Sequence, residues 1–111
     1  MKRQAIYNKV RDHLLKQGRA AKFSCAGYLV CAYRGDDGTA CAVGCLIPAA
    51  RYSPEMEGLS LQYLISGGRL PRVSERTLAL LQSLQSVHDT TQPYTWATEL
   101  AHVARLHGLK P

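Results

Sequence analysis

The sequence contains no apolar run approaching the roughly 20 residues that a membrane-spanning helix requires. Its first stretch, MKRQAIYNKVRDHLLKQGR, is charged throughout and lacks the apolar core of a secretory signal. We therefore expect a cytoplasmic protein with no membrane partner. In such a reducing compartment, the four cysteines are expected to be free thiols or metal ligands.

The sequence also lacks the motifs of several common enzyme classes. It contains no glycine-rich phosphate loop, no HExxH zinc motif, no Ser-His-Asp arrangement and no paired-carboxylate site. Each of these chemistries needs particular side chains at a particular spacing, and none of the spacings is present. This absence predicts that the protein is not an enzyme.

Acidic residues are scarce, with 8 Asp and Glu against 14 Lys and Arg, and the formal net charge is +6. The excess lies within residues 1–22, where seven basic residues face Asp12 alone. Lys2, Lys9 and Lys16 are spaced seven residues apart, which places them in a stripe on one flank of a helix over residues 3–17. Such a stripe attracts nucleic acid or an acidic protein surface.

The 111 residues are expected to form a single α+β domain spanning residues 1–111, because 46% of them are hydrophobic. Apolar spacing predicts the first helix over residues 3–17, ended by Gly18. The turn letters RGDDGT separate two apolar runs, which predicts a β-hairpin with strands over residues 26–33 and 40–47. Three further helices, expected over residues 55–65, 75–88 and 93–107, would pack on this hairpin.

The four cysteines are spaced Cys25-x5-Cys31-x9-Cys41-x3-Cys45. In an extended strand, Cys41 and Cys45 would lie about 13 Å apart, too far to share one tetrahedral zinc or a disulfide. Cys31 and Cys41 would face each other across the hairpin in one register. The favoured interpretation is buried, unreactive thiols, and two alternatives remain open: a redox pair, or a metal site of Cys31, Cys41 and either Cys45 or His88.

His88 falls on the same helical face as Leu81, Leu84 and Val87, with Asp89 next to it. A buried histidine beside a carboxylate is suited to holding a metal ion or to acting as a base for a cysteine. The alternative, which we favour, is a core histidine whose ring nitrogens are satisfied by hydrogen bonds.

Several segments together resemble a group of small proteins encoded by bacteriophages and prophages. They are CAYRG, CAVGCLIP, Tyr52, the Met56-Glu57-Gly58 segment, Val87-His88-Asp89 and Trp96, and the resemblance extends from about Ile6 to His107. It implies a context, the cytoplasm of a bacterial host, and assigns no catalytic or binding residue. Short phage accessory proteins often act by binding a host protein, as anti-CRISPR proteins do when they block bacterial immunity.

The leading hypothesis is a non-enzymatic accessory protein that binds and inhibits or modulates a host protein or nucleoprotein complex. Its expected contact surface comprises Lys2, Lys9, Lys16 and Arg34. One alternative is a small nucleic-acid-binding module that uses the same helix. The other is a module stabilised by zinc at the cysteines, and no other cofactor is expected. The oligomeric state stays open, with a homodimer through the helical face as one arrangement.

Overall fold

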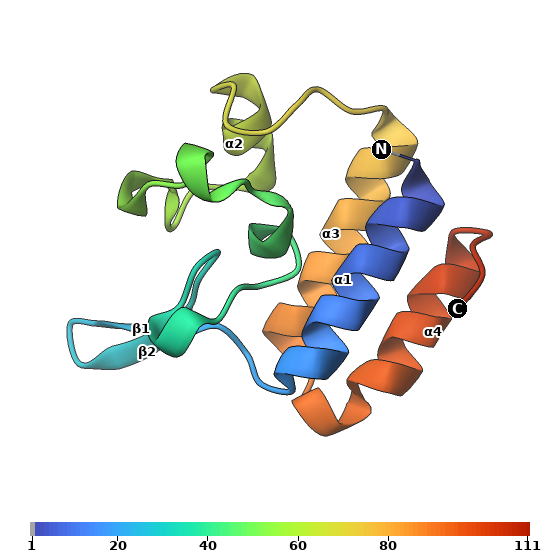
Figure 1. Cartoon of the computed structure of the whole chain (residues 1–111), viewed down its shortest axis with the longest axis horizontal. Helices are drawn as coiled ribbons and strands as arrows, with labels where there is room; N and C mark the ends of the chain where they lie inside the picture. The colour runs from blue at the N-terminus through green and yellow to red at the C-terminus, as the bar shows by residue number, and fades with distance from the viewer. Residues whose placement is uncertain (1) are drawn as a thin grey trace.

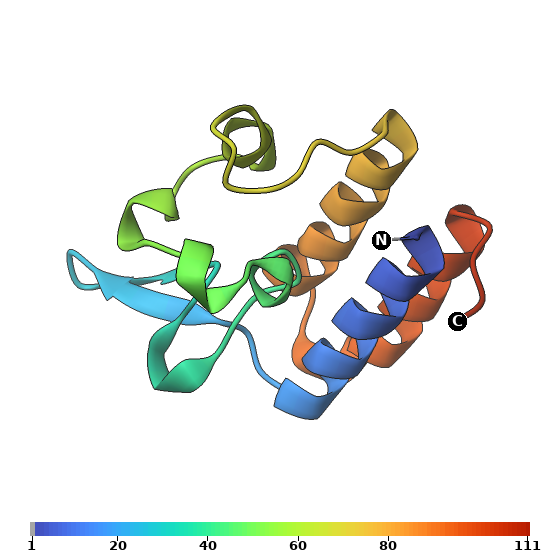
Figure 2. The same cartoon turned by 45° about the horizontal axis from the view of Figure 1, so that its top comes forward.

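Three helices lie side by side and form the larger part of the computed structural model, which describes residues 2–111 (Figures 1 and 2). They are α1 (Arg3–Gln17), α3 (Glu75–Thr90) and α4 (Trp96–Leu106). Gly18 ends α1 in the left-handed conformation, at φ 68°, and its N–H donates to the Leu14 carbonyl. Ser74 caps α3 by accepting from the Thr77 N–H.

The three helices bury a shared apolar core. The α1 face that spacing predicts is buried, and the Tyr7 hydroxyl donates to the Leu100 carbonyl of α4 at 3.0 Å. From α3 and α4 the fully covered side chains include Leu80, Leu84 and Trp96. Within residues 2–111, no helix is both long enough and apolar enough to cross a membrane.

The remaining part of the fold carries a short hairpin and the six-residue helix α2 (Leu61–Ser66). Strand β1 (Lys22–Cys25) pairs with β2 (Tyr28–Cys31) in antiparallel register, with Phe23 opposite Val30. The two-residue turn between them has positive φ at both positions, 51° at Ala26 and 84° at Gly27, which matches the twist of a tight hairpin. The predicted α+β class is confirmed.

The hairpin lies earlier in the chain than the sequence analysis predicts. Residues 40–47 do not form a strand, because Gly44–Leu46 is a 3-10 turn and the Cys45 N–H donates to the Cys41 carbonyl. Consequently Cys31 lies opposite Lys22, and the register that would place Cys31 opposite Cys41, which the sequence leaves open, does not occur.

The helix predicted over residues 55–65 is also shorter than expected. Pro54–Met56 is a separate 3-10 turn, and α2 begins only after Ser60, whose side chain accepts from the Tyr63 N–H.

The last helix begins with the 3-10 turn Pro93–Thr95, where proline is favoured because its missing N–H needs no partner. The predictions for residues 3–17 and 75–88 are confirmed to within a few residues.

Candidate functional site

A cleft of about 570 Å³ opens between the end of β2, the segment 57–62 and α3. Glutamine side chains at Gln62, Gln82 and Gln85 line it together with apolar groups, and the charged residues among those that line it are Glu57 and Asp89. A cleft with acidic charge is unexpected in a protein whose formal net charge is +6. This makes the cleft the first candidate for a specific binding site.

One wall of the cleft is fixed by Glu57. Its carboxylate accepts from the backbone N–H groups of Tyr33 at 2.8 Å and Arg34 at 3.0 Å, and from the Tyr52 hydroxyl at 2.7 Å. Burial and the neighbouring Glu57 carboxylate raise the pKa of Tyr52 to about 12. The three hydrogen bonds attach the segment that contains Glu57 to the chain that leaves β2, so this wall is held in a defined position.

Next to Asp89 and beneath the surface lies His88, which is 2% exposed and stacks on Trp96 with ring centroids 5.7 Å apart. The Ala21 N–H donates to its Nε2 at 2.8 Å, so Nε2 carries a lone pair and the proton lies on Nδ1. Nδ1 in turn donates to the Asp89 Oδ1 at 2.7 Å. The interpretation of His88 as a satisfied core histidine is therefore confirmed, and its ring is neutral.

Cys31, His88 and Asp89 offer ligand atoms within 4.8 Å of one another, the one such metal-ligand group found within residues 2–111. A metal ion needs a free lone pair, but Nε2 is engaged by the Ala21 N–H and Nδ1 carries the proton. Cys41 and Cys45 do not belong to this group. The structure therefore does not assemble the predicted metal set, and the trio it does assemble does not fit a metal ion.

The cysteines occupy different environments, and the expectation of four buried thiols is wrong. Cys25 and Cys31 are exposed, Cys45 is half-buried and Cys41 is buried. Burial raises the pKa of Cys41 to about 12 and that of Cys45 to about 11. Partial burial and then the Asp89 charge raise the pKa of Cys31. A nucleophilic cysteine typically has a lowered pKa, and the pKa of Cys31 is shifted in the opposite direction.

Alkylation by N-ethylmaleimide at pH 8 is expected to label Cys25 first, because it is exposed. Cys31 should follow more slowly, since its raised pKa leaves less of it as thiolate, and Cys41 should react only after unfolding in urea. Intact-mass spectrometry over time measures the order, and a Cys25→Ser variant should lose the fastest step. Labelling of Cys41 in the native protein as fast as Cys25 would contradict the burial of Cys41.

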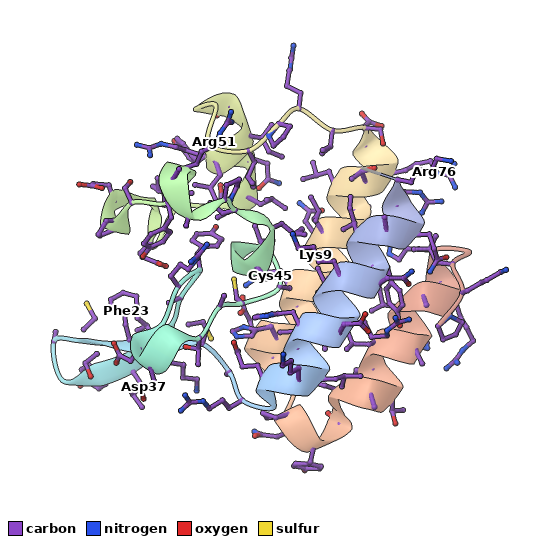
Figure 3. The ribbon with its side chains drawn as sticks, in the orientation of Figure 1. Lys9, Phe23, Asp37, Cys45, Arg51 and Arg76 are labelled. Carbon is purple, nitrogen blue, oxygen red and sulfur yellow. The ribbon has the colours of Figure 1, made fainter. Side chains whose placement is uncertain are left out.

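The predicted lysine stripe is present on the exposed surface of α1. Lys2, Lys9 and Lys16 are all exposed, and no ion pair within residues 2–111 engages them. Lys9 lies near Cys45, where its charge acts on the thiol (Figure 3). The stripe is available to a partner of opposite charge.

Arg34, the fourth predicted contact residue, is turned into the fold. Its guanidinium donates to the Ile47 carbonyl at 2.8 Å and lies over the Tyr52 ring at 5.5 Å. It is half-buried and its Nε has no hydrogen-bond partner among the described residues. Arg34 therefore connects its own segment to Ile47 and Tyr52. The three lysines are the exposed members of the predicted surface.

A group of exposed apolar side chains on the hairpin and beside the cleft is not predicted from the sequence. Their exposed fractions are 74% for Tyr28, 65% for Leu29, 37% for Val30, 43% for Leu59 and 68% for Tyr63. For the hairpin residues of this group, the sequence signal is the uncharged run AGYLVCAY, which predicts a strand covered by helices. In the structure this run projects from the helical core (Figure 1).

Comparison with known proteins does not assign the chain. No family model, curated protein or solved structure matches it. The features that bear on its function are therefore the cleft, the exposed apolar side chains and the lysine stripe.

Proposed function

We propose that this chain is a non-enzymatic phage or prophage accessory protein that binds a host protein and inhibits or modulates it. The observation that carries the proposal is the exposed apolar surface of the hairpin and the segment beside the cleft, formed by Tyr28, Leu29, Val30, Leu59 and Tyr63. We refer to these five residues as the hairpin patch. A bacterial defence complex, the class of target that anti-CRISPR proteins block, is the first to test.

The hairpin patch favours a protein partner because β2 leaves aromatic and aliphatic side chains exposed on both of its faces. Exposed apolar side chains concentrated in one element are typical of interaction sites. Tyrosine in particular combines a large apolar ring with a polar hydroxyl and is enriched at interface centres. Covering such side chains contributes roughly 25 cal/mol for each Å² of apolar area removed from water. Tyr28 and Tyr63, both more than two-thirds exposed, are the expected anchors.

Catalysis by the cleft is disfavoured by the state of the reactive groups in it and next to it. The pKa of the Cys31 thiol is raised, and both ring nitrogens of His88 are engaged in hydrogen bonds. A general base must have a lone pair available to the reacting proton, and His88 has none. The side chains of the cleft are suited to recognition, since they offer amides, apolar groups and two carboxylates.

A second candidate function is nucleic-acid binding through Lys2, Lys9 and Lys16. It is favoured by one observation, the exposure of Lys9 and Lys16 on α1 and of Lys2 directly before it. This function predicts generic binding to DNA or RNA that weakens steeply as salt rises, because counterions are released when lysines contact phosphates. Protein binding through the hairpin patch predicts weak salt dependence.

Affinity capture from a nuclease-treated lysate of the bacterial host separates the two functions. We expect the wild-type protein to retain a host protein, and a Tyr28→Ser, Leu29→Ser double variant to bind it about tenfold or more weakly, since one expected anchor and the apolar side chain next to it are removed. A Lys9→Glu, Lys16→Glu double variant should reduce capture less and flatten its dependence on salt. Retention that disappears with nuclease treatment, or that only the lysine variant abolishes, would instead support the nucleic-acid module.

A further inference from the structure

The hairpin has two outer edges, and the described residues cover one of them in part. The Ala32 N–H donates to the Ala21 carbonyl at 3.0 Å, which makes residues 21 and 32 a hydrogen-bonded pair. Such pairs alternate along an antiparallel ladder, so the next outward-facing N–H and C=O groups belong to Lys22 and Ser24 on β1 and to Leu29 and Cys31 on β2.

The edge of β1 is covered at Lys22. Gly35 lies so close that a Cβ there would be 2.5 Å from the Lys22 nitrogen and 2.7 Å from its oxygen, and the turn 34–40 continues beside it. The edge of β2 differs. Tyr28, Leu29 and Cys31 are exposed, and no hydrogen bond from elsewhere in residues 2–111 reaches the backbone of Leu29 or Cys31.

Apart from its length of four residues, the open edge of β2 has none of the features that prevent strands from pairing with other chains. Its sequence, Tyr-Leu-Val-Cys, contains no charge and no proline, and it adopts regular pairing without a bulge. Natural proteins usually protect an exposed edge with lysine, proline or a bulge, because its unpaired N–H and C=O groups are a template for another strand. An unprotected edge beside a cleft is therefore suited to strand addition.

The cleft indicates the charge of the added strand. The Cys31 side chain points toward Asp89, since its sulfur lies within 4.8 Å of an Asp89 carboxylate oxygen. Asp89 is exposed, and its charge is not cancelled by His88, because the ring that donates to it is neutral. A strand added about 4.8 Å from β2 would direct the side chain opposite Cys31 toward this carboxylate.

We propose that the open edge of β2 and the adjoining cleft bind an extended peptide segment of the partner protein, which adds as a strand at Leu29 and Cys31. The segment carries apolar side chains on one face and an arginine or lysine that reaches Asp89, with Glu57 as the second carboxylate of the cleft. This inference rests on the proposed function, since it specifies how the host protein is recognised.

A second copy of this chain does not suit the edge. Its β2 contains no basic residue, so pairing of two copies would leave Asp89 without an opposite charge. Two paired four-residue strands also bury far less than the roughly 1,200 Å² of total surface found in stable interfaces. A segment of another protein that contains a basic residue can pair with the edge of β2 and also place a positive charge near Asp89.

The test uses a displayed library of random dodecapeptides as the probe and the full chain as the target. Leu29→Pro removes the outward N–H of β2 and leaves the ladder to β1 unchanged, whereas the matched variant Leu29→Ala keeps that N–H and shortens the side chain. Asp89→Asn removes the charge and retains an oxygen for His88 Nδ1, and Glu99→Gln is its matched control on α4. Thermal unfolding establishes that each variant is folded.

We expect enriched peptides to alternate apolar residues and to contain an arginine or lysine. Fluorescence anisotropy of synthetic copies should show about tenfold weaker binding to Leu29→Pro, because one backbone hydrogen bond is lost, and a smaller loss with Leu29→Ala. Asp89→Asn should weaken binding severalfold, and Glu99→Gln should leave it unchanged.

Three results would overturn the proposal: no enriched peptide, enriched peptides without a basic residue, or equal binding to Leu29→Pro and Leu29→Ala. Sedimentation of the protein alone tests whether a second copy of the chain occupies the edge. A dimer that dissociates in the Leu29→Pro variant would also overturn the proposal. If the peptides fail while the hairpin patch still captures a host protein, strand addition is wrong and the proposed function stands. If capture fails as well, both are wrong.

Discussion

Replacement of Gly44 by alanine is expected to destabilise the protein by about 3 kcal/mol or more, because a Cβ at this position has no space. It would lie 1.8 Å from the Tyr33 carbonyl oxygen and 2.7 Å from the carbonyl carbon. Both are backbone atoms, so no side-chain rotation relieves the overlap. Urea denaturation followed by circular dichroism measures the free energy of unfolding.

The backbone at Tyr33 is also held in place from two sides. Its carbonyl accepts from the Cys41 N–H at 3.2 Å, and its own N–H donates to Glu57 at 2.8 Å. Moving Tyr33 away from the methyl group added at position 44 would break these bonds and disturb the wall of the cleft. The cost of Gly44→Ala therefore includes either steric overlap or lost hydrogen bonds.

Gly67→Ala provides the matched control. Gly67 has φ −82°, which any residue adopts, and its added Cβ would lie 3.1 Å from the Tyr63 carbonyl oxygen at the end of α2. We expect a change within about 1 kcal/mol. Equal urea midpoints for the Gly44 and Gly67 variants would show that the backbone segments at Gly44 and Tyr33 do not approach each other this closely.

The long helices were predictable because their signals are local. Ile6, Val10 and Leu14 recur at helical spacing, Gly18 follows as a stop, and Ser74 precedes α3 as a cap. Each signal acts within one or two turns of the chain. The positions of these helices can therefore be predicted without knowledge of contacts between distant parts of the chain.

The hairpin was misplaced because its actual turn has a weak sequence signal. Ala26 is an unusual residue at a position with φ 51°, whereas Asp36, Asp37 and Gly38 are residues that favour turns. The apolar residues of the segment 40–47 favour a strand, but in the structure this segment forms a 3-10 turn in which Gly44 approaches the Tyr33 backbone closely. That approach joins distant backbone segments, which apolar periodicity does not report.

The candidate site was predictable only in part. The neighbouring residues His88 and Asp89 were singled out from one helix, and the structure confirms that the ring is buried and satisfied. The position of Cys31 beside them depends on where the hairpin packs, and Ala21, which sets the proton position on His88, gave no signal in the sequence. Interactions within one helix were accessible, while those between distant segments were not.

Raising the pH from about 9 to about 11 is expected to lower the free energy of unfolding, by on the order of 2 kcal/mol from Cys41 alone. Burial raises the pKa of Cys41 from 9.0 to about 12 in the folded protein. Well below pH 9 the thiol is protonated in both states and contributes no pH dependence. Above it, the unfolded chain releases the proton while the folded protein retains it, so stability falls as the pH rises.

The contribution of Cys41 is isolated by comparing urea denaturation of the wild type and a Cys41→Ser variant across this pH range. Tyr52, whose pKa is also raised to about 12, affects both proteins equally, whereas the pKa of Tyr33, raised to about 12 by burial and then by the charge of Cys41, changes with the substitution. The stability difference between the two proteins should therefore shrink as the pH rises. A constant difference for Cys41→Ser would mean that water reaches this thiolate in the folded protein, and that the turn at Gly44 does not seal the core beneath the cleft.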